Sequence, residues 1–229
     1  MSLEVGYISK SEVSPGVFTF RFSRPAGFSF VAGQFFKLTL GDASKYFSFS
    51  SPVTDNGFLE FTTRMSGSDF KKRLDGLRTG NNVLFDGPMG SLKYSSSDGG
   101  AVFLAGGIGI TPFFSILSTL RSLGEKIDVV LVYGSRSYED IIFRQELEAI
   151  EGSGVGLRVV HVLSNPSGGD VGCRGGFITA GLLSEEISDY SERKFYVCGP
   201  PKMVESMRVV LSELGVSVDE VVFESFTGY

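Results

Sequence analysis

The chain has 229 residues and a formal net charge of −5, with 42% hydrophobic and 21% charged side chains. This acidic balance gives no reason to expect a nucleic acid partner, and no run is long and apolar enough to span a bilayer. With two cysteines and one histidine, the usual zinc sites and a four-thiolate iron–sulfur cluster are excluded, so no metal site is expected. The first residues lack the layout of a signal peptide, and we expect a cytoplasmic protein.

The single histidine also limits hydrolytic chemistry. His161 lies in VVHVLS, which is typical of a buried strand, and a hydrogen-bonded core histidine is favoured there over a catalytic one. The chemistry of this chain is therefore expected to come from a bound cofactor.

Residues 1–97 are expected to form a small antiparallel barrel of about six strands. Short aromatic or β-branched runs recur between glycine, proline, serine and aspartate. The clearest are GVFTFRFS, GQFFKLTLG, KYFSFSS and GFLEFTT, and Asp55-Asn56-Gly57 favours a hairpin turn. One helix is expected, from about Ser68 to Leu77. The serine- and glycine-rich segment 94–100 marks the seam to a second domain, residues 98–229.

A phosphate-binding feature is predicted where the last of these strands leads into the helix, in TTRMSGSDFKKRL, residues 62–74. Ser68 is a natural N-cap, and N–H groups in a first helical turn attract a diphosphate. The alternative is that Ser68 only caps a surface helix. Three interpretations are open for the cations that follow, Lys71, Lys72 and Arg73. They could reinforce phosphate binding, form a docking patch for an acidic protein, or simply make a solvated face of the helix.

Residues 98–229 are expected to form a doubly wound α/β domain. The strand-like runs AVFLAG, IDVVLVYG, LRVVHVLS, KFYVCG and EVVFESF alternate with helical stretches that begin near Pro112, Glu139, Gly176 and Pro201. This alternation is typical of a parallel sheet with helices on both faces.

The strongest functional signal is FLAGGIGITP, residues 103–112. A short apolar run leads into Gly106, Gly107 and Gly109, and Thr111 and Pro112 open a segment with helical spacing. A strand, a glycine turn and a helix in this order bring backbone N–H groups up to a pyrophosphate. The pattern is G-x-G-x-x-P rather than the G-x-G-x-x-G fingerprint, and a tight turn without a ligand is the alternative.

A further motif, FYVCGPPKM at residues 195–203, places Cys198 at the carboxyl end of a predicted parallel strand. Gly199 and Pro200 then lead into a helix. Ligands of such sheets bind outside the carboxyl ends of the strands, although a lone buried cysteine is more often structural.

Together these motifs resemble those of the ferredoxin–NADP reductase superfamily, over almost the whole chain. KYFSFSSP (45–52) is similar to the family's Arg-x-Tyr-Ser-x-x-Ser flavin strand, GPMGSL (87–92) to its Gly-Pro-x-Gly turn, and FYVCGPPKM to its Cys-Gly-Pro-Pro-x-Met motif. The resemblance implies a flavin-binding antiparallel barrel followed by an NAD(P)-binding α/β domain, as in the small reductases of the flavin reductase and oxygenase reductase branch.

The flavin strand departs from the family pattern twice. Lys45 stands where the family has an arginine that pairs with the flavin phosphate, and lysine keeps the charge but loses the two-pronged geometry. Phe47 stands where tyrosine is usual, so a stacking face remains without the hydroxyl. Weaker retention of the flavin is therefore expected. Without the other motifs, an aromatic strand with outward polar residues would be the preferred interpretation.

The resemblance implies roles for four residues in the reaction. Ser48 would steady flavin N5, Cys198 would flank the nicotinamide, Glu224 would be a carboxylate near the flavin, and Tyr229 would cover the flavin and move aside for the nicotinamide. Besides the residues already named in the motifs, the implied cofactor contacts are Tyr46, Phe49, Ser50, Thr62, Thr63, Met65, Ser66, Gly67, Ile108, Pro201, Met203 and Phe226.

The expected cofactors are FAD and NADPH or NADH. FAD is preferred over FMN because the helix at Ser68 can receive a second phosphate. At the end of the second strand of this domain stand Gly134, Ser135 and Arg136 in place of an acidic residue, which favours a 2′-phosphate and hence NADPH. Against this, Ser164 is followed by Asn165, where NADP-preferring relatives commonly have arginine.

The implied function is hydride transfer from NAD(P)H to flavin N5 and delivery of electrons to a separate ferredoxin, flavodoxin or oxygenase component. The departures at Lys45 and Phe47 keep open a free-flavin reductase, in which flavin is a substrate. A third reading is an electron-transfer subunit of a larger complex, although such subunits often carry a C-terminal cysteine cluster that this sequence lacks. The oligomeric state stays open.

Overall fold

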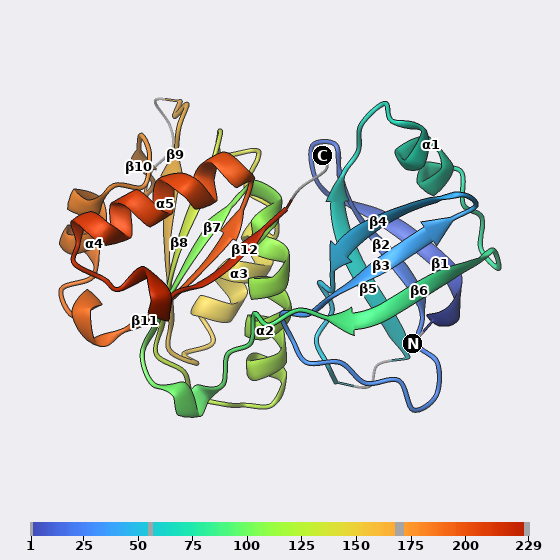
Figure 1. Ribbon diagram of the computed structural model, residues 1–229, viewed down its shortest axis with the longest axis horizontal. Helices are drawn as coiled ribbons and strands as arrows, with labels where there is room; N and C mark the ends of the chain where they lie inside the picture. The colour runs from blue at the N-terminus through green and yellow to red at the C-terminus, as the bar shows by residue number, and fades with distance from the viewer. Residues whose placement is uncertain (1, 55–56, 168–171, 227–229) are drawn as a thin grey trace.

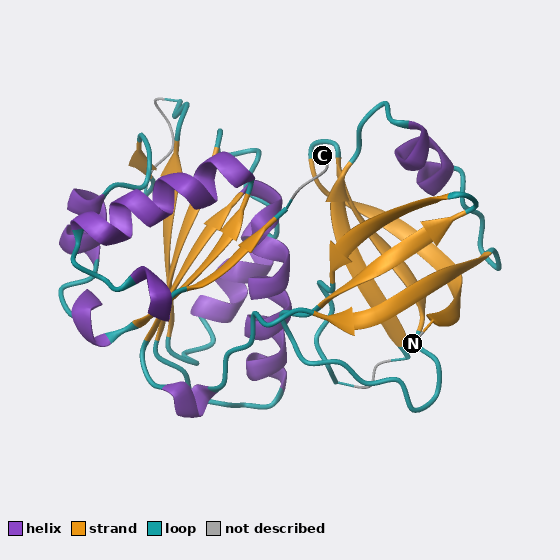
Figure 2. Cartoon of the chain, in the orientation of Figure 1, coloured by secondary structure: helices purple, strands orange, loops and turns teal. Residues whose placement is uncertain are grey.

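Two six-stranded sheets organise the chain, one in each of two domains that lie side by side (Figure 1). The computed structural model describes residues 2–54, 57–167 and 172–226. The first domain is built mostly of strands, whereas helices cover the sheet of the second (Figure 2). The predicted fold class, an antiparallel barrel followed by a doubly wound parallel sheet, is confirmed.

The first sheet is antiparallel and closes into a barrel. Its strands are β1 (Ser2–Ser14), β2 (Val17–Ser23), β3 (Phe35–Leu40), β4 (Ala43–Ser48), β5 (Phe58–Arg64) and β6 (Asn82–Met89), in the order β4-β3-β6-β1-β2-β5. The two edge strands meet just beyond β4, where Phe49 forms a bridge with Phe61 of β5. The Ser50 N–H adds a hydrogen bond of 2.8 Å to the Glu60 carbonyl oxygen. Pairing the edges in this way satisfies backbone groups that an open sheet would expose.

Phenylalanine fills the barrel. Side chains alternate between the two faces of a strand, and Phe20 and Phe22 of β2 are fully buried on the inner face. Both rings stack on Phe61, with centroid distances of 5.4 and 5.8 Å. Helix α1 (Asp69–Asp75) joins the same core through Leu74. The core of this domain is therefore an aromatic stack that holds β4 and α1 in fixed positions.

Two strands carry weaker sequence signals than the others. β1 pairs with both β2 and β6, and register shifts interrupt its pairing with β2, which disturbs the alternation by which a strand is recognised. Residues 87–89, which the motif predicts as a turn, form the end of β6, with Met89 opposite Phe35. The predicted hairpin turn at 55–57 lies largely outside the described residues.

The second sheet is parallel, and its strand order contains a reversal. Its strands are β7 (Ala101–Gly106), β8 (Val129–Ser135), β9 (Leu157–Leu163), β10 (Arg174–Gly175), β11 (Lys194–Gly199) and β12 (Val222–Ser225), in the order β10-β9-β8-β7-β11-β12. The chain moves outward from β7 to β10 and then returns to β11 on the other side of β7. The crevice outside the carboxyl ends of strands at such a reversal is where ligands bind in open α/β sheets.

Helices cover both faces of this sheet (Figure 2). α2 (Ile110–Ser122) and α3 (Arg144–Glu151) pack on one face, and α4 (Ala180–Glu186) and α5 (Pro201–Glu213) pack on the other. α3 begins at Arg144, later than the predicted Glu139, because the preceding segment packs and hydrogen-bonds against the sheet instead of within a helix. There Ile142 is fully buried, and its N–H donates to the Tyr133 hydroxyl at 3.2 Å. None of the described helices is both long and apolar enough to cross a membrane.

The barrel packs on the second domain through α2. Ser115 of α2 donates to the Ser51 carbonyl oxygen at 2.6 Å, and the Val53 N–H donates to Thr119 Oγ1 at 3.0 Å. The connection between the sheets, residues 90–100, contains a short 3-10 turn. The boundary proposed between residues 97 and 98 falls in this connection and stays a prediction.

His161 lies on β9, with its ring centroid 5.9 Å from that of Tyr133. Burial lowers the pKa of the imidazole. The expected hydrogen bond is absent at one nitrogen, since Nδ1 is buried without a partner among the described residues. The predicted strand is present, but the prediction that His161 is a hydrogen-bonded histidine is wrong at Nδ1.

Candidate active site

A cavity of about 580 Å³ opens where the barrel meets the end of β12. We call it the barrel cavity. It is lined by Phe35, Ser44, Lys45, Tyr46, Phe47, Ser48, Lys71, Met89, Glu224, Ser225 and Phe226. β4 therefore contributes most of the barrel side, and the last described residues contribute the other side.

Ser48 and Glu224 meet in this cavity although they belong to different domains. Ser48 ends β4, is almost fully buried, and its hydroxyl donates to Glu224 Oε1 at 3.4 Å. Burial raises the pKa of Glu224 to about 7, and the Ser48 hydrogen bond partly opposes this shift. A carboxyl group with this pKa exchanges a proton readily at neutral pH, so the pair is suited to acid–base work at the cavity wall.

Lys45 and Lys71 line the same cavity. Lys71, from α1, is only 7% exposed; it donates to Thr63 Oγ1, and its Nζ lies 4.7 Å from the centroid of the Phe47 ring. Burial and the neighbouring charge of Lys45 lower the pKa of Lys71 to about 8. Two cations on one cavity wall favour an anionic ligand. The phosphate of a flavin nucleotide fits this requirement.

The aromatic residues of β4 differ in their accessibility. Phe47 is 9% exposed and stacks on Phe61 in the barrel core, with ring centroids 4.4 Å apart. Tyr46 is 63% exposed, and its ring meets that of Phe35 edge-on at 5.8 Å. Tyr46 therefore presents the more accessible ring to a ligand, whereas Phe47 forms the floor beside Lys71.

Eight predicted flavin contacts do not line the barrel cavity: Phe49, Ser50, Thr62, Thr63, Met65, Ser66, Gly67 and Ser68. Ser50 and Thr62 lie inside the barrel wall, where their hydroxyl groups are 2.9 Å apart. Ser68 is the N-cap of α1, as the sequence predicts, and accepts a hydrogen bond from the Lys71 N–H at 3.4 Å. The binding of a diphosphate by this loop stays a prediction.

A second cavity, of about 610 Å³, lies at the carboxyl ends of the parallel strands, and we call it the nucleotide cavity. The predicted coenzyme contacts on its wall are Gly106, Gly107, Gly134, Ser135, Arg136, Pro200 and Met203. The wall also contains Arg64, Asp140, Phe177 and Lys202, which the sequence analysis does not identify. Arg64 belongs to β5 of the barrel, and its place inside the predicted phosphate segment, residues 62–74, is the local signal for it.

Close approach of the chain explains the glycines of FLAGGIGITP. A Cβ at Gly109 would overlap the Cys198 carbonyl oxygen, and a Cβ at Gly106 would overlap Met203 Sδ. Gly107 has a φ of +52°, which favours glycine. α2 has no side-chain cap at its start, and the Gly107–Gly109 turn lies at the N-terminus of this helix, where the helix dipole favours an anion. This turn fits the pyrophosphate of a dinucleotide.

The other predicted coenzyme contacts do not line the nucleotide cavity. These residues are Ile108, Gly109, Thr111, Pro112, Cys198, Gly199 and Pro201. Thr111 Oγ1 donates to the Ile108 carbonyl oxygen at 3.0 Å and stabilises the turn. Direct contact of this group with a coenzyme stays a prediction.

Cys198 lies between a strand that reaches the nucleotide cavity, β7, and a strand that reaches the barrel cavity, β12. It is fully buried on β11, opposite Ala105 of β7 on one side and Glu224 of β12 on the other. Burial, together with the Glu224 charge, raises the pKa of the thiol well above its ordinary value. The thiol therefore stays protonated at neutral pH.

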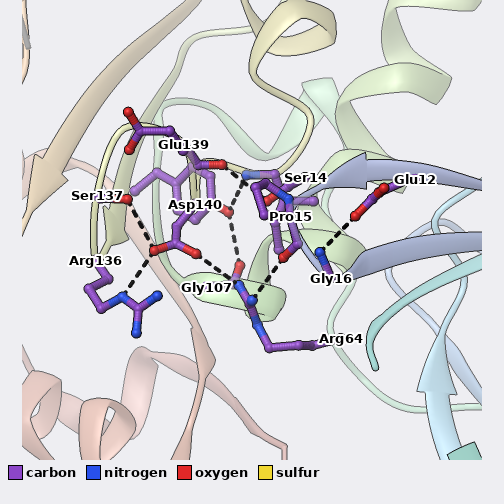
Figure 3. Close-up of polar contacts among 12 residues, drawn as sticks. Glu12, Ser14, Pro15, Gly16, Arg64, Gly107, Arg136, Ser137, Glu139 and Asp140 are labelled. Carbon is purple, nitrogen blue, oxygen red and sulfur yellow. Dashed lines mark hydrogen bonds and ion pairs between the residues drawn. The ribbon is translucent and has the colours of Figure 1, made fainter. Parts of the chain in front are cut away.

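Asp140 holds two arginines, one from each domain (Figure 3). Its carboxylate lies 3.4 Å from Arg64 Nη2 and 3.1 Å from Arg136 Nε, and Ser137 Oγ donates to it at 3.2 Å. The Asn165 N–H donates to the Arg136 carbonyl oxygen at 2.8 Å. The two opposing signals for coenzyme choice, Arg136 and Asn165, thus lie side by side.

The predicted gate at Tyr229 lies outside the described residues and stays a prediction. Phe226 lines the barrel cavity, and its N–H donates to the Gly199 carbonyl oxygen at 3.1 Å. This bond fixes the end of the described chain to the last residue of β11.

Two family models match consecutive parts of the chain. The Oxidoreductase FAD-binding domain matches residues 5–94, and the Oxidoreductase NAD-binding domain matches residues 103–209. The chain belongs to the oxidoreductases that combine these two domains, the combination that the ferredoxin–NADP reductase resemblance implies. It pairs an FAD-binding barrel with an NAD-binding α/β domain, as the motifs predict.

Individual relatives agree with this assignment. The chain is 30% identical over 234 residues to the reductase subunit of stachydrine N-demethylase from Rhizobium meliloti, covering 96% of this chain and 65% of that protein. It is 28% identical over 214 residues to the reductase component of propane 2-monooxygenase from Rhodococcus jostii, covering 89% of this chain and 57% of that protein. The chain thus spans less than two thirds of either relative.

Among solved structures, a ferredoxin–NADP+ reductase from Neisseria gonorrhoeae with bound FAD and NADP superimposes with a TM-score of 0.83. The alignment covers 98% of each chain at 23% identity. At this identity the likeness shows a shared fold.

Proposed function

We propose that this protein is an NAD(P)H-dependent flavoprotein reductase that moves a hydride from NAD(P)H to flavin N5 and passes the electrons to a separate acceptor. The observation that carries the proposal is the contact between Ser48 and Glu224, because Glu224 is also the register partner of Cys198. The barrel cavity and the carboxyl end of β11 therefore meet at Glu224. This juxtaposition supports transfer between ligands held by the two domains.

The chain itself would supply orientation and local electrostatics. When bound, a reduced nicotinamide supplies a hydride and a flavin accepts it. Ser48 donates a hydrogen bond at the cavity wall, and Glu224, with a pKa of about 7, holds or releases a proton there. Cys198 stays uncharged because its thiol pKa is raised. Holding two reactants in register is itself a large contribution to rate.

The proposed acceptor is a separate electron carrier, such as a ferredoxin, a flavodoxin or an oxygenase component. The relatives named as reductase subunits or components of a demethylase and a monooxygenase support this choice. The two cysteines are too few for a four-thiolate cluster, which supports a one-electron carrier outside these 229 residues. We also propose a cytoplasmic location, which the low cysteine content supports.

A second candidate is a free-flavin reductase, in which flavin is a loosely held substrate. Lys45 favours it, because lysine binds a phosphate as a point charge and lacks the fork of the family's arginine. The exposed Tyr46 ring on the cavity wall is also compatible with exchange of the flavin.

An absorbance spectrum of the purified protein, followed by anaerobic titration with NADH and with NADPH, tests the proposal. A yellow protein whose flavin band bleaches on titration is expected. A colourless protein that oxidises NAD(P)H only after flavin is added would favour the second candidate. Absence of bound flavin together with no oxidation of NAD(P)H in the presence of added flavin would reject both.

A further inference from the structure

The three consecutive cations of α1 have different surroundings. Lys72 Nζ lies 3.6 Å from Asp69, and Arg73 pairs with Asp42. Lys71 is buried against the barrel cavity, and within the described part of the chain it forms no ion pair with a carboxylate. The structure therefore separates one buried cation from two surface cations on the same short helix.

The neighbours of Lys71 do not compensate its charge. Thr63 Oγ1 accepts its hydrogen bond, and the Phe47 ring lies under its Nζ, but both groups are neutral. Burial, and after it the repulsive charge of Lys45, lowers the pKa of Lys71 to about 8. A buried cation without a counter-charge is costly to the folded state. Such a group is more often found where a ligand supplies the missing charge.

The acid of the same cavity lies away from these cations. Glu224 bonds to Ser48, three residues along β4 from Lys45, which is about 10 Å at the rise of a strand. The cavity is therefore cationic beside Lys45 and carries its carboxyl group at the other end of this stretch of β4. An elongated ligand with an anionic tail and a neutral ring system matches this distribution.

We propose that Lys71 binds the phosphate of the flavin nucleotide together with Lys45. The inference rests on the proposed function, since it concerns how the same flavin is held. Two point charges on neighbouring elements, β4 and α1, would replace the single forked arginine of the family motif. The ligand group recognised is a phosphate ester, which FMN and FAD carry and riboflavin lacks.

Three flavins and two variants test this assignment. Dissociation constants of FAD, FMN and riboflavin are measured by flavin fluorescence with the full chain freed of flavin, at pH 7. Lys71→Met should weaken FMN and FAD binding at least tenfold and should change riboflavin binding less than twofold. Lys72→Met is the matched control, because it removes a surface cation of the same helix, and it should leave all three constants unchanged.

Two results would overturn the assignment: FMN affinity that survives Lys71→Met, or an equal loss for FMN and riboflavin. A wild-type chain that binds none of the three flavins would reject the proposed function itself, and this inference with it. These outcomes are distinguishable because riboflavin reports the ring site alone.

The wild-type chain provides a second test that does not depend on the folding of a variant. The FMN phosphate is already dianionic at pH 7, since its second pKa is about 6. Because the pKa of Lys71 is about 8, the ratio of FMN affinity to riboflavin affinity should fall as the pH rises from 7 to 9. A ratio that does not change over this range would contradict a role for Lys71.

Discussion

Arg64 of the barrel and Asp140 of the second domain form an ion pair across the domain boundary, with 3.4 Å between Nη2 and Oδ1. Beside it, Ser14 Oγ of β1 donates to the Glu139 carbonyl oxygen at 3.2 Å (Figure 3). The same Asp140 carboxylate binds Arg136, the residue expected to meet a 2′-phosphate. The barrel therefore helps to position the acid that competes with the coenzyme for this arginine.

Asp140→Asn should shift the coenzyme preference towards NADPH. The substitution removes the charge that neutralises Arg136, so the guanidinium is released for a 2′-phosphate, which NADH lacks. Asp140 is buried but Arg136 is 76% exposed, and an ion pair with one exposed partner contributes about 1 kcal/mol, which corresponds to a factor of about 5 in the ratio of the two dissociation constants. Titration with NADPH and NADH measures the ratio. Glu139→Gln, an exposed neighbour, is the control, and an unchanged ratio in Asp140→Asn would show that Arg136 does not meet the 2′-phosphate.

Glu224→Gln should remove a pH dependence of stability in the flavin-free protein. Burial raises the pKa of Glu224 from 4.5 to about 7, so the folded state holds a proton that the unfolded state has lost between these values. The free energy of unfolding should therefore fall as the pH rises from about 4.5 to 7, by on the order of 2 kcal/mol.

Urea unfolding at pH 5, 6, 7 and 8 measures this dependence. Glu224→Gln should flatten the profile and be more stable than the wild type at pH 8. Glu220→Gln, an exposed glutamate in the turn before β12, should follow the wild-type profile. If the Glu224→Gln profile runs parallel to the wild type, the carboxyl group is not buried as described.

Cys198→Ala should slow the reduction of bound flavin by NAD(P)H without changing the flavin content. Cys198 lies on β11 next to Glu224 and behind the glycine turn, so its removal disturbs the nicotinamide side and leaves the barrel intact. Stopped-flow reduction and the ratio of flavin to protein absorbance are the measurements. Cys173→Ala is the control. Loss of flavin from Cys198→Ala would place the thiol in the flavin site instead.

Gly109→Ala should destabilise the second domain by about 2 kcal/mol or more, as overpacking of a tight contact does. The added methyl group would overlap the Cys198 carbonyl oxygen, which is backbone and cannot move aside cheaply. Gly181→Ala, on α4, is the matched control, because its Cβ meets nothing closer than 4.0 Å and alanine favours a helix. Thermal unfolding compares the two, and equal stability would mean that the turn is looser than the structure shows.

Phe177→Ala should weaken NADH and NADPH binding by a similar factor of about 5, because the ring is a stacking surface at the wall of the nucleotide cavity. Phe177 is 76% exposed although the adjacent Ile178 is buried. An exposed aromatic ring gains nothing from burial in the free protein, whereas a stacked ligand would cover it. Val209→Ala, an exposed apolar residue of α5 outside the cavity, is the control. Coenzyme titration decides, and unchanged affinity would remove Phe177 from the site.

Patterns that are local along the chain predicted most of the fold. The run into Gly106, the Cys198 motif and the Ser68 cap are each contained within about ten residues, so the sequence displays them directly. The sequence pattern did not predict β1 because register shifts in its pairing with β2 break the alternation of side chains. The start of α3 was misplaced because the segment before it satisfies its backbone against Tyr133 rather than within a helix.

By itself, the sequence determined the order of the two domains, the glycine turn and the cation at position 45, since each depends on residue type and short-range spacing. Only the tertiary structure decided which side chains share a cavity: Ser48 with Glu224, Lys71 with Lys45, and Asp140 with both Arg64 and Arg136. Most of these partners come from different strands, helices or domains. Burial, which raises the pKa of Glu224 and lowers that of Lys71, arises from the packing of these elements and has no signature in the linear chain.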